Sequence, residues 1–233
     1  MNLWQEDTTE TIRQPVATMT DALFRIVCER LPVDHAQALS NAVMAEVPWL
    51  REQAQAGIHP IHVAGSQNGW ERPDMRSGAE LILSKRTRLT VRVPNDQADA
   101  LIESLSGKDL SIDGLKLSVV SGTKRTINAS ATLFSRYTWF SALASNQEGP
   151  FVDAVVAQCQ QLGFQPTKLL CGKSHQIITA QGEICARSVL LADVPKEHSL
   201  RIQDAGLGNL RAIGCGLVIP HKDTAAIQQL ADE

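Results

Sequence analysis

Residues 88–119, RLTVRVPNDQADALIESLSGKDLSIDGLKLSV, change the spacing of their apolar side chains twice. Apolar and polar residues alternate over 89–93, which predicts a half-buried strand whose outer face carries arginines. Apolar residues then recur at helical spacing over 98–105, and Gly107 is the expected stop. Alternation returns over 115–119. The stretch therefore predicts strand, helix and strand in succession.

The preceding residues supply the same elements in the same order. An apolar, partly β-branched run over 23–27 predicts a buried strand. Asp34 is placed to cap a helix, with Gln37 completing a capping box. A short strand is expected near 61–63, inside an irregular excursion rich in Gly, Pro and Asn. Residues 21–126 are thus interpreted as one βαββαβ unit.

The second half repeats this order without repeating the sequence. Residues that favour strands over 132–140 precede a helical stripe over 151–162, and a hairpin is expected to join 177–180 to 184–191. A short last strand over 217–219 follows a glycine-rich segment. The predicted fold class is α+β, with two tandem ferredoxin-like (βαββαβ, RRM-like) units. The second unit is expected to have a degenerate last helix and a Gly-rich loop.

The domain organisation follows from these elements. We expect a loose lead-in over 1–20, a first unit over 21–140, a linker over 141–150, a second unit made of 151–222 together with strand 132–140, and an acidic tail over 223–233.

The charge of the chain is nearly balanced but unevenly distributed. Its 233 residues include 22 Lys and Arg against 25 Asp and Glu, a formal net charge of −3, which argues against a uniformly basic nucleic-acid binder. Residues 84–136, however, hold 9 basic and 5 acidic groups, and residues 168–222 hold 7 and 4. Localised cations of this kind suit a selective RNA binder.

Neither a membrane span nor a signal peptide is expected. No stretch approaches about 18 uninterrupted apolar residues, and the N-terminus, MNLWQEDTTETIR, is acidic and polar. The five cysteines are scattered without a CxxC pair, which indicates reduced thiols rather than a disulfide framework or a zinc site. We therefore expect a cytoplasmic protein with no membrane partner, no metal and no cofactor.

The most unusual local feature is GLGNLRAIGCGLVIPHK, residues 206–222. Glycines let backbone amides approach a phosphate closely, although a tight turn between packed elements is the simpler alternative. A dinucleotide fingerprint would need a third glycine where Arg211 stands and a long helix afterwards, and a Walker loop would need Gly-Lys-Ser/Thr. Both nucleotide-binding interpretations therefore fail.

This loop, combined with two ferredoxin-like units, resembles the RAMP superfamily of CRISPR systems. More narrowly, LPVDHAQAL (31–39), GIHPI (57–61) and SKRTRLTVRVP (84–94) resemble the sixth CRISPR-associated (Cas) family, over about residues 21–222. That family consists of endoribonucleases that cut the repeats of precursor CRISPR RNA. The resemblance implies metal-independent cleavage, in which a ribose 2′-hydroxyl attacks the adjacent phosphate and a 5′-hydroxyl leaves.

Such cleavage needs a proton acceptor, a proton donor and cations around the phosphate. The resemblance implies that His35 is the catalytic residue, because the catalytic histidine of the family is commonly found at or near this first helix. His35 would be the first residue of the helix capped by Asp34, where the helix dipole favours an anion. The alternative for His35 is a surface histidine that merely helps to cap the helix. His59 and His62 are the rival pair, and either could act as a second proton-transfer group.

Basic side chains and the glycine loop are the predicted RNA contacts. Their expected role is to hold the phosphate backbone, although a solvated strand face is the usual fate of alternating charges. With only 4% aromatic residues, the chain suits recognition of a hairpin stem by shape and phosphates more than stacking of single-stranded bases. The predicted contacts are Lys85, Arg86, Arg88, Arg92, Lys124, Arg125, Arg136, Gly206, Gly208, Arg211, Gly214, Gly216, His221 and Lys222.

Three functions remain open from the sequence. The first is an endoribonuclease that binds the repeat hairpin of precursor CRISPR RNA and retains the mature guide RNA, with other Cas subunits of an effector complex as further partners. The second is a RAMP-type scaffold that binds guide RNA without cutting it. The third is a generic ferredoxin-like regulatory domain, which leaves the basic strand and the glycine loop unexplained.

Overall fold

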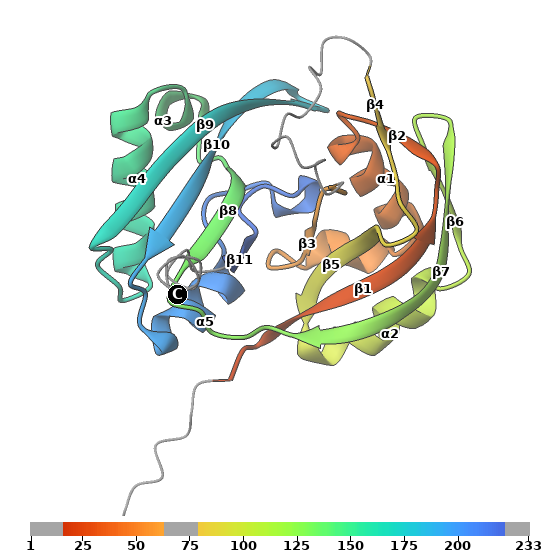
Figure 1. The fold of residues 1–233 in the computed structure, drawn as a ribbon, viewed down its shortest axis with the longest axis horizontal. Helices are drawn as coiled ribbons and strands as arrows, with labels where there is room; N and C mark the ends of the chain where they lie inside the picture. Colours follow the sequence, from red (N-terminus) through yellow and green to blue (C-terminus); the bar gives the residue numbers. More distant parts are fainter. Residues whose placement is uncertain (1–15, 63–78, 222–233) are drawn as a thin grey trace, which may run out of the picture.

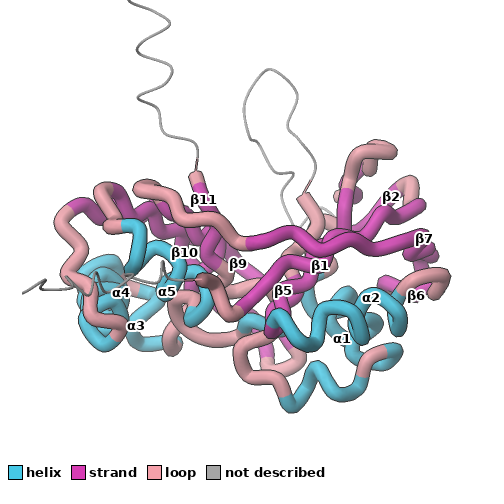
Figure 2. Tube along the Cα trace, turned by 90° about the horizontal axis from the view of Figure 1, so that it is seen from below, coloured by secondary structure: helices cyan, strands magenta, loops and turns pink. Residues whose placement is uncertain are grey.

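The computed structural model of the chain describes residues 16–62 and 79–221. They form two main sheets that come from successive halves of the chain, each with helices packed against it, and one small two-stranded sheet (Figure 1). Figure 2 shows the helices of both halves along one side of the molecule and the strands along the other. None of the helices in these ranges is long and apolar enough to span a membrane.

The first half builds a five-stranded antiparallel sheet in the order β3-β5-β1-β7-β6. Two helices, α1 and α2, cover one face of it (Figure 2). The strands are β1 (Met19–Val27), β3 (Gly57–Ile58), β5 (Arg88–Pro94), β6 (Asp109–Ile112) and β7 (Leu115–Thr126). The helices are α1 (Ala36–Glu46), η1 (Pro48–Glu52), η3 (Asn95–Gln97) and α2 (Ala98–Leu105). A separate two-stranded sheet pairs β2 (Arg30–Pro32) with β4 (Glu80–Ile82).

The second half builds a four-stranded antiparallel sheet in the order β11-β8-β10-β9. Its strands are β8 (Leu133–Thr138), β9 (Lys168–Thr179), β10 (Gly182–Ala192) and β11 (Val218–Pro220). Its helices are α3 (Ala142–Asn146), α4 (Glu148–Gln161), α5 (Lys196–Ala205) and η4 (Arg211–Ile213).

Both sheets arrange a βαββαβ unit in the same way. In the first, β1 lies between β5 and β7, and in the second, β8 lies between β10 and β11, so each unit's first strand separates its third from its last. This confirms the prediction of two tandem ferredoxin-like units. The hairpin edge strand β6 is an addition that the sequence analysis missed.

Two details of the predicted organisation are wrong. Residues 141–150, predicted as a linker, form α3 and the first turn of α4, and the chain passes between the two sheets over 127–132 instead. The last helix of the second unit is a regular ten-residue helix, α5. Polar Ser199 and Gln203 are buried on it together with apolar residues, so its apolar stripe is too weak for prediction.

The predicted capping box of α1 is also wrong. His35 is the N-cap residue, and the residues around it bind the second half of the chain instead. Asp34 Oδ2 accepts a hydrogen bond from the backbone N–H of Ile178 at 3.2 Å, and Gln37 Oε1 accepts one from Ala180 at 3.0 Å. These side chains attach the β9–β10 hairpin to the start of α1.

Three other predictions fall at the edges of the described ranges. The paired strand in the GIHPI region is β3, just before the predicted 61–63, and Val63 lies outside the described residues. The end of the predicted lead-in, Met19 and Thr20, belongs to β1. The predicted acidic tail, 223–233, is outside the described residues.

Candidate nucleic-acid interface

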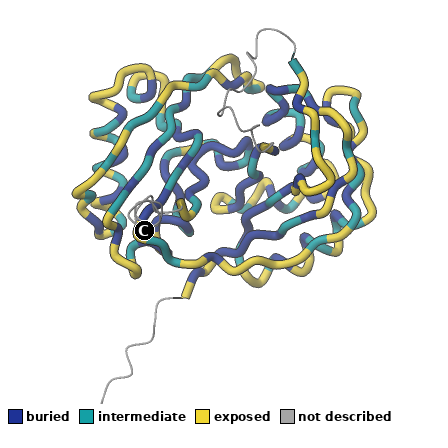
Figure 3. The backbone as a smooth tube through the Cα atoms, in the orientation of Figure 1, coloured by how far each residue is buried: buried dark blue, intermediate teal, exposed yellow. Residues whose placement is uncertain are grey.

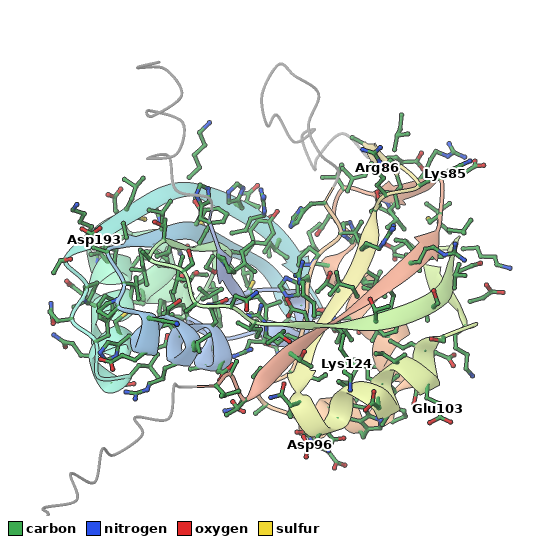
Figure 4. All side chains as sticks on the ribbon, turned by 60° about the horizontal axis from the view of Figure 1, so that its bottom comes forward. Lys85, Arg86, Asp96, Glu103, Lys124 and Asp193 are labelled. Carbon is green, nitrogen blue, oxygen red and sulfur yellow. The ribbon has the colours of Figure 1, made fainter. Side chains whose placement is uncertain are left out.

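The face of the first sheet that the helices leave open carries a group of cations. Arg25 on β1 and Arg88 on β5 are directly opposite each other in the sheet register, and both are exposed. Arg125, on β7, is exposed on the same face, and the turn between β4 and β5 adds exposed Lys85 and Arg86 (Figure 4). We call Arg25, Lys85, Arg86, Arg88 and Arg125 the basic face.

The opposite side of the first half is acidic. Exposed Asp96, Asp99 and Glu103 lie in or next to α2. Lys124, which was predicted as an RNA contact, points to this side and pairs with Asp99 at 2.9 Å (Figure 4). Because charge is separated in this way, a polyanion is attracted to the open face of the sheet and repelled from the helices.

Arg25 is a basic-face residue that the sequence analysis missed. It lies inside the apolar run 23–27, which was interpreted as a wholly buried strand, yet it occupies an outward position of β1. Like charges directly opposite each other on a sheet repel, so the Arg25–Arg88 pair is costly unless an anion lies between the two guanidinium groups. Arg88 Nη1 also donates to the carbonyls of Lys85 at 3.0 Å and Thr87 at 2.9 Å, which orient it.

Arg92 is not part of this face, and its burial opposes the predicted phosphate contact. It is only 1% exposed, because the second half of the chain covers that end of the sheet. Arg92 Nε donates to Asp21 Oδ1 at 2.8 Å. Its Nη1 donates to the backbone carbonyls of Gln203 at 3.1 Å and Val218 at 2.7 Å. Arg92 therefore joins the two halves.

Asp21 is the centre of a buried charge network. Burial would raise the pKa of this carboxyl, but its contacts with His59 and Arg92 outweigh burial and hold the pKa far below its ordinary range. Arg125 Nη2 donates to its other oxygen at 2.9 Å. His59 Nε2 lies 3.8 Å from Asp21 Oδ1, and burial lowers the pKa of this imidazole. Asp21 thus connects the basic face to the GIHPI segment.

The glycine loop packs against protein rather than solvent, which opposes the predicted phosphate contacts. All four glycines have positive φ, and all but half-buried Gly208 are fully buried. A Cβ at Gly208 would overlap the carbonyl of Trp139, and one at Gly214 would overlap the ring of Pro60. A Cβ at Gly206 would likewise overlap the carbonyl of Gly216, and one at Gly216 would overlap the carbonyl of Leu207. The loop needs glycine for close packing.

Arg211 likewise makes contacts within the protein, and its burial opposes the predicted contact with RNA. It is 6% exposed, and its Nη1 donates to the carbonyls of Asp204 and Ala205 at the end of α5. Burial lowers the pKa of its guanidinium to about 10, which leaves it charged at neutral pH. Arg211 thus stabilises the C-terminus of α5, where carbonyls have no helical partners.

Two motifs of the family resemblance contact each other. Pro60 of GIHPI lies against Gly214, and Gly57 lies against Leu217 and the carbonyl of Arg211. We call this contact between residues 57–62 and 206–217 the seam. The chain is largely buried along it, whereas the outer edges of the molecule are exposed (Figure 3).

His35 lies beneath the seam with both ring nitrogens in use. It is 1% exposed, and its Nε2 accepts the backbone N–H of Ile61 at 2.9 Å. Nδ1 therefore carries the proton and donates to the carbonyl of Pro32 at 2.8 Å. This geometry opposes proton transfer by His35, since the ring would have to leave both hydrogen bonds.

The remaining predicted contacts lie on the second sheet. Arg136 lies over the ring of Phe134, with its guanidinium carbon 5.7 Å from the centroid, and exposed His221 approaches the same ring at 5.7 Å. Lys222 is outside the described residues. Within 16–62 and 79–221, no three His, Cys, Asp or Glu side chains are grouped as a metal site.

The family model of Cas6, described as Cas6 Crispr, matches residues 20–223. The CRISPR-associated endonuclease Cas6 of Myxococcus xanthus (strain DK1622) is 27% identical over 208 residues, which are 89% of this chain and 84% of that protein.

Two solved structures have a similar fold. A structure described as an RAMP protein binding different RNA substrates has a TM-score of 0.61 at 13% identity, covering 87% of this chain and 100% of that one. A structure of CRISPR associated protein Cas6 has a TM-score of 0.58 at 10% identity, covering 88% and 100%. Since the family model matches nearly the whole chain, the chain belongs to the Cas6 family, the CRISPR-associated endonucleases involved in CRISPR RNA processing.

Proposed function

We propose that the chain is a metal-independent endoribonuclease of CRISPR RNA maturation. It binds the repeat hairpin of precursor CRISPR RNA through phosphates and cleaves it by attack of a 2′-hydroxyl on the adjacent phosphorus. The products are a 2′,3′-cyclic phosphate and a 5′-hydroxyl. Membership of the Cas6 family supports this proposal.

The observation that carries the proposal is the basic face beside a seam that bears histidines. Arg25, Arg88 and Arg125 are exposed on an uncovered sheet, and Asp21 connects Arg125 to His59. Guanidinium groups bind phosphate oxygens with charge-assisted hydrogen bonds, and imidazoles transfer protons near neutral pH. RNA held on the basic face would therefore have its backbone close to groups that can catalyse its cleavage.

The test uses purified protein and a synthetic RNA of one repeat from the CRISPR array of the organism that encodes the chain. We expect cleavage at one position in excess EDTA, with a 2′,3′-cyclic phosphate on the upstream product. A repeat with a single 2′-deoxy sugar at that position should bind equally well and remain intact. Cleavage that stops in EDTA, or that still occurs with the 2′-deoxy repeat, would contradict the mechanism.

The scaffold function makes the opposite prediction for the same experiment. The buried position of His35 favours it, because His35 is the histidine whose predicted catalytic role supported cleavage. Tight binding of the repeat without any cleavage would support the scaffold.

A further inference from the structure

Two histidines flank one tyrosine where the two halves of the chain meet. The imidazole of His62 lies 6.0 Å from the ring centroid of Tyr137, tilted by 44°. The imidazole of His175 lies 5.3 Å from the same centroid, nearly perpendicular to it at 86°. Tyr137 is 3% exposed, whereas His62 is exposed and His175 half-buried. The three side chains come from the position directly after the GIHPI segment, from β8 and from β9.

The surrounding structure fixes the backbone of all three residues. His35 Nε2 accepts the N–H of Ile61, the neighbour of His62. The carbonyl of Tyr137 accepts the N–H of Gly216, in the glycine loop, at 2.6 Å. Close to His175 on β9, the N–H of Ile178 is bound by Asp34, next to the start of α1. Residues at the start of α1 thus hold both segments that carry the histidines.

The other histidines of the described residues have different surroundings. His35 is buried with both nitrogens bonded, and burial lowers the pKa of His59 beside Asp21. His198 packs on Phe164 at 5.5 Å, away from the seam, and His221 contacts Phe134. Only around Tyr137 do two imidazoles from different halves approach one side chain within the described residues.

We propose that His62 and His175 are the proton-transfer pair of this enzyme, with Tyr137 as the residue that positions them; this rests on the proposed function. One imidazole takes the proton of the 2′-hydroxyl while O2′ forms its bond to phosphorus. The other donates a proton to O5′ as the P–O5′ bond breaks. Protons and bonds balance, and the two imidazoles exchange protonation states during one turnover.

The first experiment compares His62→Ala, His175→Ala and His198→Gln in single-turnover cleavage of the repeat RNA. Loss of one acid or base typically slows cleavage by about 10²–10⁴-fold, so both active-site variants should fall in that range and His198→Gln should equal the parent. Binding of the 2′-deoxy repeat should change less than about threefold. Since His175 is half-buried, His175→Gln is a second variant, and thermal melting identifies any variant that fails to fold.

A bridging sulfur at the 5′ position of the scissile phosphate then separates the two roles. A thiolate leaves without a proton donor, so this substrate should restore near-parental cleavage to the variant that lacks the acid and not to the one that lacks the base. The pH profile of the parent should be bell-shaped, and each variant should lose one limb. A residue with only a structural role would produce neither result.

The outcomes distinguish this assignment from the proposed function. If the parent cleaves the repeat and both His62→Ala and His175→Gln cleave it at the same rate, the assignment is overturned and the proposed function is not. Equal rescue of both variants by the sulfur substrate would also overturn it. A parent protein that binds the repeat and never cleaves it would overturn the proposed function and this assignment with it.

Discussion

The ring of His35 makes two hydrogen bonds, and substitutions can remove one or both of them. His35→Ala removes the partner of the buried N–H of Ile61 and of the partly buried carbonyl of Pro32, and the buried N–H alone costs about 1–3 kcal/mol of unfolding free energy. His35→Gln retains an acceptor near the position of Nε2. We therefore expect His35→Ala to lower both melting temperature and cleavage rate, and His35→Gln to recover much of both.

The same comparison tests the original prediction for His35. If His35 transfers a proton, His35→Gln should be as inactive as His35→Ala, although the melting temperature of His35→Gln stays close to that of the parent. Urea unfolding and single-turnover cleavage, measured on the same samples, separate the two roles.

His59 should make the stability of the protein depend on pH near neutrality. Burial lowers its folded pKa from the ordinary 6.5, so the unfolded chain takes up a proton first as the pH falls. Its contribution to stability is present above about pH 6.5 and is lost below it, with a limiting slope of about 1.4 kcal/mol per pH unit. The pKa of Asp21 is also lowered from 3.8, but its stabilisation is lost only at more acidic pH.

Thermal melting between about pH 7.5 and 5 checks this expectation. Stability should fall toward pH 5 in the parent and in the control His198→Gln, and the fall should be smaller in His59→Gln. Identical curves for His59→Gln and the parent would show that His59 does not titrate in this range.

Two arginines in the same sequence pattern differ in how far the structure buries them. Arg88 and Arg92 occupy equivalent outward positions of one strand, and the alternating pattern predicts both to be exposed. Arg88 is exposed, whereas Arg92 is covered by α5 and β11. Local spacing determines which side of a strand a residue faces, but it holds no information on which distant segment packs there.

On the scale of elements, a substitution on the basic face should weaken RNA binding without lowering the stability of the protein. If the basic face binds phosphate as proposed, Arg25→Thr removes one phosphate contact together with the repulsion from Arg88, and threonine suits an exposed strand position. We expect weaker binding of the 2′-deoxy repeat, a salt slope smaller by about one, and a melting temperature that stays equal or rises.

The matched control is Arg51→Ala, which removes an exposed arginine from η1, on a different element from the basic face. Its affinity and salt slope should equal those of the parent, as measured by fluorescence anisotropy over a series of salt concentrations. An equal loss in both variants would mean that RNA senses total charge rather than the basic face.

Elements with a strong apolar pattern could be predicted, and those with buried polar residues could not. The helices over 98–105 and 151–162 have regular apolar stripes and appear as α2 and α4. Helix α5 buries Gln203. Its side-chain amide donates to the backbone carbonyl of Asn128, and its backbone carbonyl accepts a hydrogen bond from Arg92. A polar residue at a core position is stable only through partners that are distant in sequence.

On the scale of the whole molecule, the order of strands and helices was sufficient to predict two ferredoxin-like units, because each unit buries its own apolar face. The seam between them was not predictable. GIHPI and the glycine loop are about 150 residues apart, and a glycine pattern alone does not distinguish a phosphate-binding loop from one packed against Pro60 and Trp139. His35 and the glycines therefore hold in place the segments that carry the proposed proton-transfer residues.

Arg92 provides a test of how strongly the two halves are joined. It binds Asp21 in the first half and the carbonyls of Gln203 and Val218 in the second, so Arg92→Leu removes one member of a buried ion pair and two contacts between the halves. We expect a loss of about 3–5 kcal/mol of unfolding free energy, against less than about 0.5 kcal/mol for Arg88→Leu on the same strand.

Hydrogen exchange followed by mass spectrometry should give one global rate for the cores of β1 and β10 in the parent and two different rates in Arg92→Leu. Affinity of the folded variant for RNA should stay unchanged, because Arg92 is not exposed to solvent. If Arg92→Leu were as stable as Arg88→Leu but bound RNA more weakly, Arg92 would be a phosphate contact and the seam would depend on its glycines alone.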